Sequence, residues 1–323
     1  MDQPTKILIT GSTGYCGHFL ARHFAGAGIP VVGLDIAPHP VIKEVPGFTF
    51  IKTDIRDRAA LEKIFAAEQP SHVIHLAYLM DPIHDKKFEY DVDVMGSKYI
   101  FEISNATASV KQFILMSSAS AYGAFPDNPE FLAEDSQLRP RDYNYGIYKR
   151  EVESYYRSYP KRQDLKLVIF RMCTAVGPSY YKPGGVVSTV AKAPFILDVK
   201  GGDGRVQFIH EEDVIALFEK IVNDADVEDT FNLAPPSYAT TRELGEAYGK
   251  KLIPLPLWML RGIFWILWNL RIAALTPAIA RLMAYGIIVS PKKLMARYSY
   301  TFKYSTKEAF LDAVEKRKAN GTL

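Results

Sequence analysis

Residues 7–17 decide the fold and read Ile7-Leu8-Ile9-Thr10-Gly11-Ser12-Thr13-Gly14-Tyr15-Cys16-Gly17. A short apolar run leads into a loop of three spaced glycines, and helix-forming sequence follows as far as Gly28. Such glycines allow a tight turn and a close approach of a phosphate to the backbone, and the helix that follows points its free N–H groups at the anion. The stretch therefore predicts a pyrophosphate-binding βα unit. The residues expected to contact the cofactor here are Gly11, Gly14, Tyr15, Cys16 and Gly17.

The pattern of the first unit repeats along the first half of the chain. Short apolar runs alternate with stretches of helical periodicity, which is typical of βαβ units around a parallel sheet. The expected strands are Ile7–Thr10, Val31–Leu34, Phe48–Lys52, His72–Leu76, Gln112–Met116 and Leu167–Phe170, and the expected helices include Gly14–Ala27, Arg58–Glu68 and Asp91–Ser104.

The alternation breaks after Arg171, where glycine- and proline-rich turns separate short elements. The sequence therefore predicts an α/β fold, a Rossmann-like doubly wound parallel sheet with a smaller C-terminal substrate lobe. Residues 1–175 are expected to form the NAD-binding Rossmann domain, with parts of 205–235 returning to it. Residues 176–323 are expected to form mainly the substrate-binding lobe.

The ends of the later strands carry further candidate cofactor contacts. Asp35 closes the second strand, where an acidic residue hydrogen-bonds the ribose hydroxyls of NAD, and no Arg or Lys follows it within residues 36–42 to hold a 2′-phosphate. NAD is therefore expected rather than NADP. Asp54 and Ile55 follow the third strand, and Leu76 and Ala77 end the fourth. For Asp54, a helix N-cap is the alternative.

A tyrosine and a lysine four residues apart follow the fifth strand. Among 19 tyrosines, only Tyr145 has a lysine at i+4, Lys149. The spacing places both on one helix face, where the ammonium favours the ionised phenol and makes it a better base near neutral pH. A surface aromatic beside a solvated lysine is the alternative.

Composition limits the class of protein. The 323 residues are 48% hydrophobic and 23% charged, with a net charge of +3 and two cysteines. A globular protein of a reducing compartment, the cytoplasm, is expected, with no nucleic-acid partner and no metal site. Prolines and polar residues interrupt the apolar stretch 252–275, which argues against a transmembrane helix.

Several of these pieces together resemble a known family. They are the glycine loop, Asp35, Asp54-Ile55, the Ser118–Gly123 segment, Tyr145 with Lys149, the segment from Arg171 to Gly177-Pro178, and Gln207–Val214. In this order the chain resembles, over residues 5–235, the extended short-chain dehydrogenase/reductases, specifically the NAD-dependent epimerase/dehydratase family. The resemblance implies that Tyr145 is the acid/base, that Ser118 binds the reacting oxygen, and that Lys149 binds the nicotinamide ribose and lowers the Tyr145 pKa. It also implies a homodimer.

The chain departs from the family at several positions. Ala119-Ser120 stands where sugar-nucleotide dehydratases of this family have Asp-Glu, so dehydration is not expected. Thr174 and Val206 stand where UDP-galactose 4-epimerases have the Asn and Arg that hold a diphosphate, although Arg205 is adjacent. Asp93 stands where the family usually has Asn, and the sequence offers no explanation for this change. The substrate contacts expected on this basis are Ser118, Ser120, Tyr122, Thr174 and Arg205.

An apolar segment near residue 260 contains all three tryptophans of the chain, Trp258, Trp265 and Trp268. Three interpretations stay open: packing of the lobe or a subunit contact, the lining of a pocket for an apolar substrate, and peripheral membrane contact with Arg261 and Arg271 at the headgroups.

The expected function is NAD(H)-dependent hydride transfer at a secondary alcohol or ketone, with Tyr145 exchanging the proton. The alternatives are a nucleotide-sugar 4-epimerase and a non-catalytic NAD-binding protein. The small-molecule substrate is left open as sugar-like or as an apolar secondary alcohol or ketone.

Overall fold

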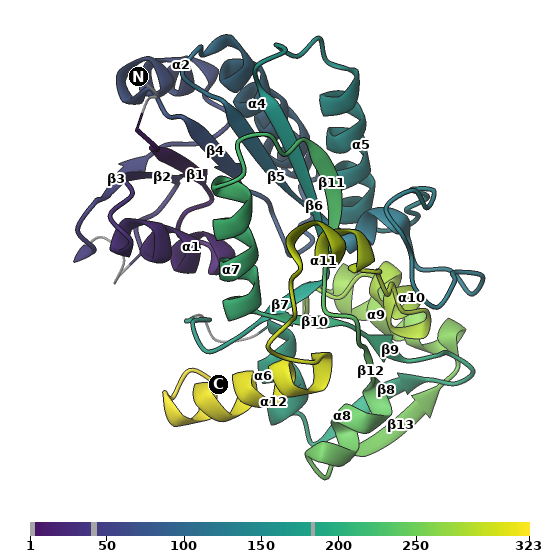
Figure 1. Cartoon of the computed structure of the whole chain (residues 1–323). Helices are drawn as coiled ribbons and strands as arrows, with labels where there is room; N and C mark the ends of the chain where they lie inside the picture. The colour runs from purple at the N-terminus through teal and green to yellow at the C-terminus, as the bar shows by residue number, and fades with distance from the viewer. Residues whose placement is uncertain (1–3, 40–43, 182–184) are drawn as a thin grey trace.

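The computed structural model describes residues 4–39, 44–181 and 185–323. Its centre is a seven-stranded sheet in the order β11-β6-β5-β4-β1-β2-β3, and every neighbouring pair is parallel (Figure 1). The chain order reverses between β1 and β4, which is the switch point where doubly wound sheets bind ligands. The strands are β1 (Ile7–Thr10), β2 (Val31–Asp35), β3 (Phe48–Lys52), β4 (His72–His75), β5 (Gln112–Ser118), β6 (Lys166–Met172) and β11 (Asp229–Leu233).

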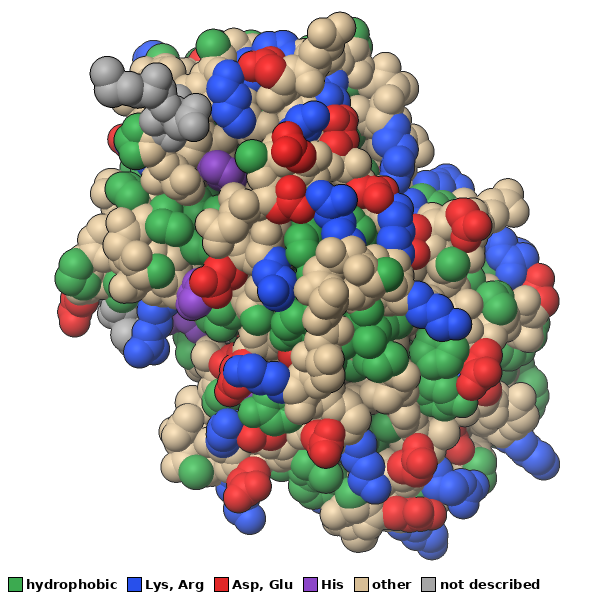
Figure 2. Space-filling view, in the orientation of Figure 1, with side chains coloured by type: hydrophobic (Ala, Val, Ile, Leu, Met, Phe, Trp, Pro, Cys, Tyr) green, Lys and Arg blue, Asp and Glu red, His purple; other side chains and the backbone are tan. Residues whose placement is uncertain are grey.

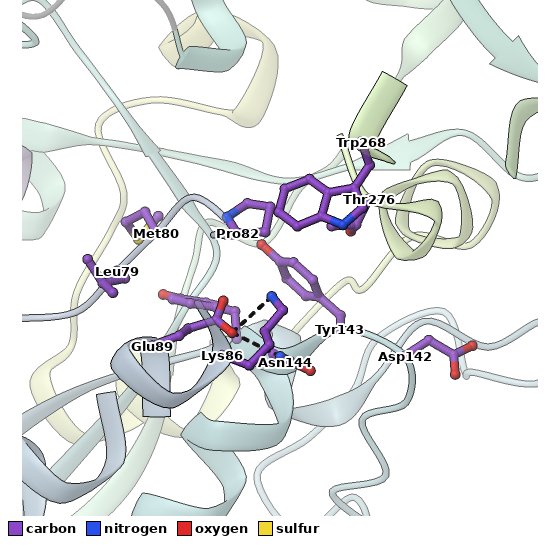
Figure 3. Close-up of a pocket in the computed structure, with 11 residues that line it drawn as sticks. Leu79, Met80, Pro82, Lys86, Glu89, Asp142, Tyr143, Asn144, Trp268 and Thr276 are labelled. Carbon is purple, nitrogen blue, oxygen red and sulfur yellow. Dashed lines mark hydrogen bonds and ion pairs between the residues drawn. The ribbon is translucent and has the colours of Figure 1, made fainter. Parts of the chain in front are cut away.

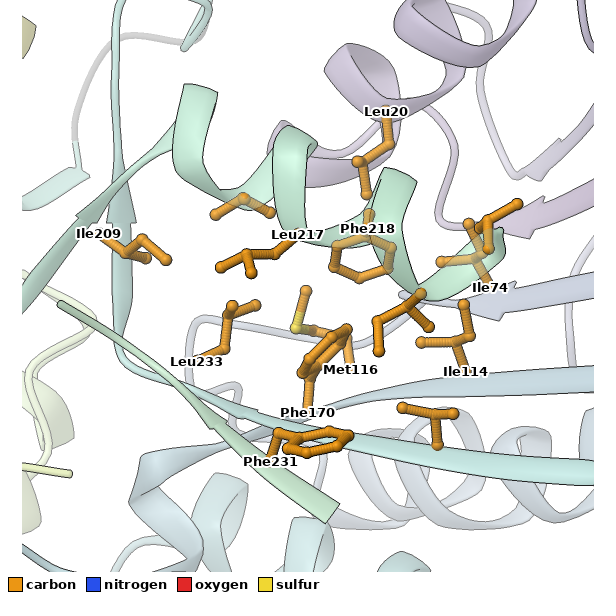
Figure 4. Close-up of a cluster of buried hydrophobic side chains, with 14 of the residues drawn as sticks. Leu20, Ile74, Ile114, Met116, Phe170, Ile209, Leu217, Phe218, Phe231 and Leu233 are labelled. Atoms are coloured by element: carbon orange, nitrogen blue, oxygen red, sulfur yellow. The ribbon is translucent and has the colours of Figure 1, made fainter. Parts of the chain in front are cut away.

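Helices cover both faces of this sheet and bury two apolar layers. One face packs against α1 (Tyr15–Gly26) and α7 (Glu211–Val222) through the side chains drawn in Figure 4. The other face packs against α2 (Arg58–Glu68), α4 (Ser97–Ala106) and α5 (Asn144–Ser158). Because both faces are buried, the strands are apolar runs rather than alternating ones. The predicted Rossmann-like fold is confirmed.

One predicted helix differs from its expectation. The sequence predicted a single helix over Asp91–Ser104, but the chain instead forms α3 (Lys86–Tyr90), a π-helical turn over Asp91–Gly96, and α4. A π-helical turn inserts an extra residue into the helix and often marks a functional site. Asp93 lies in this turn.

The smaller lobe is built from short strands and helices of the second half. Its paired strands are β7 (Thr174–Val176) with β10 (Phe208–His210), β9 (Arg205–Val206) with β12 (Ala239–Thr240), and β8 (Phe195–Val199) with β13 (Lys251–Leu255). Its helices are α6 (Gly185–Lys192), α8 (Thr241–Ala247), α9 (Leu257–Asn269), α10 (Pro277–Ala284) and α12 (Thr306–Ala319). Late in the chain, α11 (Lys292–Tyr298) returns to the central sheet and packs on β11.

Two helices of the smaller lobe begin with a capping box, and charges of both signs lie on the surface. Thr240 with Glu243 and Ser305 with Glu308 form capping boxes at the start of α8 and α12. Figure 2 shows basic and acidic side chains interspersed over the face that carries α7 and α11. Within the described ranges, no helix is both long and apolar enough to cross a bilayer.

Candidate active site

The glycine loop lies against the end of β4 at the switch point. Gly11 has a φ of +69°, and a Cβ atom there would stand 2.7 Å from the Ala77 backbone nitrogen. A Cβ atom on Gly17 would stand 2.0 Å from the Gly11 carbonyl oxygen. Both glycines are therefore required by close backbone contacts. The loop, Leu76 and Ala77 form one continuous backbone surface at the start of α1, which fits the pyrophosphate of a dinucleotide.

Tyr15 and Cys16 are half-buried at this surface, and the Tyr15 hydroxyl is engaged by a residue of α7. The Tyr15 hydroxyl donates to Glu211 Oε2 at 2.8 Å, and burial raises the pKa of the Cys16 thiol to about 12. Glu211 also accepts from the Ser179 backbone N–H and hydroxyl, and the Tyr181 hydroxyl donates to the Thr13 carbonyl at 2.8 Å. These contacts, which sequence reasoning missed, bring the segment after β7 over the glycine loop.

Asp35 is placed at the end of β2 beside the loop, as the sequence indicated. Its carboxylate accepts from the Thr13 N–H at 3.1 Å and from the Ile36 N–H at 2.8 Å. The residue is half-buried. This is the position from which an acidic group reaches a ribose.

Asp54 is engaged by its own neighbour. Arg56 binds the Asp54 carboxylate at 2.6 Å, and this hydrogen bond lowers the pKa of Asp54. The N-cap of α2 is Asp57 and not Asp54, so the alternative role considered for Asp54 is wrong. Ile55 is buried against Gly96, where a Cβ atom would come within 2.7 Å of it.

Ser118 and Tyr145 come together because α5 approaches the chain after β5 very closely. Ser118 ends β5 and caps the 3₁₀ turn Ala119–Tyr122, its Oγ accepting from the Ser120 N–H at 3.1 Å. A Cβ atom on Gly146 would stand 2.4 Å from the Ser120 carbonyl oxygen, so glycine is required beside Tyr145. The Tyr145 phenol is hydrogen-bonded with Ser118, which opposes the rise in the pKa of Tyr145 that burial causes.

Lys149 is buried beneath the Tyr145 ring. Its Nζ donates to the Met116 carbonyl at 2.7 Å and lies 3.4 Å from the centroid of the Tyr78 ring and 5.5 Å from that of Tyr145. Burial lowers the pKa of Lys149, and the nearby Asp93 opposes this by favouring the ammonium. The solvated-lysine alternative is therefore excluded, since Lys149 is only 2% exposed.

Asp93 and Tyr78 complete this cluster and were not assigned from sequence. Asp93 Oδ1 accepts from the Leu79 N–H at 2.8 Å. Asp93 Oδ2 and the Tyr78 hydroxyl are buried, and neither has a hydrogen-bond partner among the described residues. Burial raises the pKa of the Asp93 carboxyl. The only sequence signal was the acidic residue in place of the family's Asn.

A buried ion pair fixes α5 to the sheet. Arg171 on β6 binds Glu153 on α5 at 2.8 Å, and both side chains are almost fully buried. Glu153 also accepts from Ser117 at 2.5 Å. The Tyr122 hydroxyl donates to Asn232 at 2.8 Å and accepts from Arg171. Tyr122, predicted as a substrate contact, is therefore completely buried in this network and holds β6 and β11 together.

The other predicted substrate residues are scattered. Ser120 is half-buried in the 3₁₀ turn beside Ser118, whereas Thr174 is exposed on β7. Arg205 is ion-paired with Asp203 at 2.7 Å and donates to the Glu130 carbonyl at 3.2 Å. Neither Thr174 nor Arg205 lines the cavity at Tyr145.

Tyr145 lines a cavity of about 120 Å³, whose other lining residues are labelled in Figure 3. Its walls come from the segment after β4, from α3, from the start of α5 and the two residues before it, from α9, and from Thr276 just before α10. Asn144 donates to Glu89 at 2.9 Å within it, and Lys86 pairs with Glu89 at 3.1 Å. The lining residues are Leu79, Met80, Pro82, Lys86, Glu89, Asp142, Tyr143, Asn144, Tyr145, Trp268 and Thr276.

The tryptophan segment forms α9, and its three tryptophans face different surroundings. Leu260 and Phe264 are buried and pack the lobe. Trp268 lines the cavity and stacks on His84 at 3.8 Å between ring centroids. Trp258 and Trp265 point outwards, with 72% and 58% of their surface exposed. The buried side of α9 therefore packs the smaller lobe, and Trp268 is the one tryptophan of the three that lines the cavity.

Fold and site together define a Rossmann-type, NAD-binding enzyme with a serine, tyrosine and lysine set at its switch point. The family model for the NAD-dependent epimerase/dehydratase family matches residues 7–234, so the chain belongs to this family, within the extended short-chain dehydrogenase/reductases. NAD is its cofactor. The glycine surface and Asp35 fit this group by the contacts given above.

Individual proteins and solved structures are also similar to this chain. An uncharacterized protein of Mycobacterium tuberculosis is 25% identical, and the match covers 96% of this chain and 83% of that protein. A UDP-glucose 4-epimerase of Cyamopsis tetragonoloba is 31% identical over 61% of this chain and 60% of its own length. The UDP-glucose 4-epimerase of Thermotoga maritima, solved with UDP-glucose, has the same fold, with a TM-score of 0.78, 21% identity, and coverage of 98% of this chain and 99% of that one.

The expectation against dehydration gains no support from the comparisons. A dTDP-glucose 4,6-dehydratase of Bacillus anthracis shares the fold, with a TM-score of 0.75, 16% identity, and coverage of 98% of this chain and 97% of that one. The fold alone therefore does not separate the two reactions. The absence of the Asp-Glu pair at Ala119-Ser120 is the remaining argument.

Proposed function

We propose that the protein catalyses NAD-dependent hydride transfer at a secondary alcohol or ketone of a sugar-like substrate, and specifically the 4-epimerisation of a nucleotide sugar. The observation that carries the proposal is the position of Tyr145. Its phenol is hydrogen-bonded with Ser118, its ring centroid lies 5.5 Å from Nζ of the buried Lys149, and its side chain lines the cavity.

The chain's own residues manage the proton. Tyr145 Oη accepts the proton of the substrate hydroxyl as the carbon-bound hydrogen leaves as hydride, and it returns the proton when the carbonyl is reduced. Ser118 hydrogen-bonds the reacting oxygen. The Lys149 ammonium favours the phenolate, against the burial that raises the pKa of Tyr145. NAD, when bound, supplies the hydride acceptor. When the hydride returns to the other face of the same carbon, the configuration of that carbon is inverted and there is no net oxidation or reduction, so the overall reaction is an epimerisation.

The lining of the cavity supports a sugar-like substrate over a steroid or acyl ketone. Polar groups on Lys86, Asp142, Asn144 and Thr276 surround the space in front of Tyr145 and can hydrogen-bond hydroxyl groups. The indole of Trp268 offers a flat apolar face to the C–H side of a sugar ring.

We infer that the sugar carries a nucleotide because two of the relatives named above are UDP-glucose 4-epimerases. Arg205 is the side chain adjacent to the family's diphosphate-binding position, and its pairing with Asp203 has to open for it to bind a diphosphate. The proposal therefore predicts that Arg205→Gln weakens binding of UDP-sugars and leaves binding of NADH unchanged.

A thermal-shift panel tests the substrate class. Protein saturated with NAD is heated with UDP-glucose, UDP-galactose, UDP, a steroid ketone or an acyl ketone, and UDP-hexose turnover is measured in parallel. We expect both UDP-sugars to stabilise the protein and to interconvert. Stabilisation by a ketone with none by the UDP-sugars would overturn the sugar assignment, whereas absence of NADH binding would overturn the whole proposal.

A further inference from the structure

The outer face of α9 is an unpartnered apolar surface. Trp258, Trp265 and Ile266 are exposed by 72%, 58% and 51%, and Leu270 and Ile272 just beyond the helix are each exposed by 65%. The helical positions lie at i, i+7 and i+8, so they share one face, while Leu260 and Phe264 on the opposite face are buried. Contiguous apolar surface of this kind on a soluble protein marks an interaction site.

The chain segment that forms this face is basic, and the acidic group near it is Asp142, which lies 3.9 Å from Arg261 and 3.7 Å from Arg281. The chain has no aspartate or glutamate between Glu246 and Glu308, and this stretch contains ten lysines and arginines. The basic residues of α11 and of the segment after it pair with acids elsewhere, as Lys293 does with Asp229 and Arg297 with Asp224. Arg271 is exposed at the end of α9, and it forms no ion pair with any residue in the described ranges. A basic group beside exposed indoles suits an anionic surface.

We propose that the outer face of α9, defined by Trp258, Trp265, Ile266, Leu270 and Ile272, docks on an anionic lipid bilayer. Indoles partition to the interface between headgroups and acyl chains, and arginine reaches the lipid phosphates. A helix of 13 residues is too short to span a bilayer but can lie in its surface. Trp268, from the inner side of α9, lines the cavity beside Tyr145, so the docked protein holds this cavity next to the bilayer.

A second copy of the chain fits this face less well. In a two-fold dimer the same patch meets itself, so Arg271 would meet a surface that offers no acidic residue from the stretch between Glu246 and Glu308. The like charges would then oppose association. An anionic bilayer supplies the missing charge.

The location of the tryptophans makes the test direct, because all three lie on α9. The full-length protein is mixed with phosphatidylcholine vesicles, with or without an equal amount of phosphatidylglycerol, and neither NAD nor substrate is added. We expect co-sedimentation with the phosphatidylglycerol vesicles, a tryptophan emission shift to shorter wavelength and quenching by brominated acyl chains. Binding is expected to weaken as salt rises.

Variants assign the binding to this face. Trp258→Ser with Trp265→Ser should weaken partitioning at least about tenfold, and Arg271→Glu about fivefold or more. Ile36→Ser and Arg22→Glu are matched controls, because they alter an apolar residue that is 64% exposed just after β2 and an exposed basic residue on α1, two elements that lie away from α9 in Figure 1. Both variants should bind like the wild type.

Three results would overturn the proposal. One is no co-sedimentation with phosphatidylglycerol vesicles at low salt, and another is undiminished binding of the double tryptophan variant. The third is a dimer, seen by light scattering without lipid, that becomes a monomer in the double tryptophan variant, since the face would then be a subunit contact. Because lipid binding requires no cofactor or sugar, none of these results bears on the proposed reaction.

Discussion

The Tyr145 region and the outer face of α9 are built in opposite ways. Around Tyr145, charged side chains are buried and held by partners on separate elements, as Arg171 is by Glu153. On α9, apolar side chains face outwards without a partner among the described residues. Chemistry needs fixed geometry, which buried polar networks supply, whereas docking needs accessible apolar surface. The contrast suggests that the first region performs the reaction and the second decides where it takes place.

Removal of the buried ion pair should have the largest effect on stability and tests the difference between the two regions. Arg171→Met removes the close partner of the buried Glu153 carboxylate and leaves only Arg157, at 3.9 Å, so we expect a loss of about 3–5 kcal/mol in the free energy of unfolding, measured by urea titration. Lys111→Met removes an exposed pair with Asp164 and should cost less than about 1 kcal/mol. Trp265→Ser, on the open face, should change stability by less than about 0.5 kcal/mol. Similar losses of unfolding free energy in all three variants would contradict the proposed difference between the two regions.

The glycine loop gives the next largest effect. Gly17→Ala forces a Cβ atom to within 2.0 Å of the Gly11 carbonyl, so the loop must shift, and we expect NADH affinity to fall about a hundredfold. Gly26→Ala, in the same helix, meets no atom within 4 Å and serves as the control. Fluorescence titration with NADH measures both. Unchanged affinity in Gly17→Ala would remove the loop from the cofactor site.

Asp93→Asn probes the cluster beneath Tyr145. The Asp93 carboxylate raises the pKa of Lys149 against the effect of burial, so its removal lets that pKa fall further. The ammonium is then lost at lower pH, and the alkaline limb of the pH–rate profile should move to lower pH, with about a tenfold loss of rate at the alkaline end. A profile that superimposes on the wild type would show that Asp93 does not act through Lys149.

Buried histidines give the smallest individual effects. Burial lowers the pKa of His18 and His72 to about 4 and that of His75 to about 3. The unfolded chain therefore binds more protons below the ordinary histidine pKa of about 6.5, so stability is full above that pH and falls as the pH decreases. At about pH 5 each histidine should cost about 1–2 kcal/mol. Urea midpoints across this range measure the slope, and His72→Gln should make it shallower; an unaltered slope would contradict the assignment.

The sequence allowed the local parts of this account to be predicted. The glycine spacing, Asp35 at a strand end, and Tyr145 with Lys149 are short-range patterns, and short-range patterns survive folding because the βαβ unit fixes their geometry. The pairing of Glu153 with Arg171 joins residues from different elements, and no spacing rule indicates it. Tyr122 was misplaced for the same reason, because its hydroxyl bonds Asn232 on the remote strand β11.

The tryptophan helix was undecided for a different reason. Its sequence is apolar on all sides, so periodicity does not indicate which face is buried. Only the packing against α10 and Val199 reveals that Trp258 and Trp265 are left outside and that Trp268 reaches the cavity. Asp93 was visible as an unusual acid, but its burial beside Lys149 depends on the π-helical turn.

The central claim is that Tyr145 moves the proton during hydride transfer, and a comparison of two tyrosines on one helix tests it most directly. Tyr145→Phe and Tyr148→Phe are loaded with NAD and mixed with a UDP-hexose, and reduction of NAD and sugar interconversion are followed together. Tyr148 contacts Asn144 and Tyr90 but does not line the cavity. The account predicts that Tyr145→Phe loses about a thousandfold or more in rate with NADH affinity nearly unchanged, while Tyr148→Phe stays close to wild type. Turnover retained in Tyr145→Phe would contradict it.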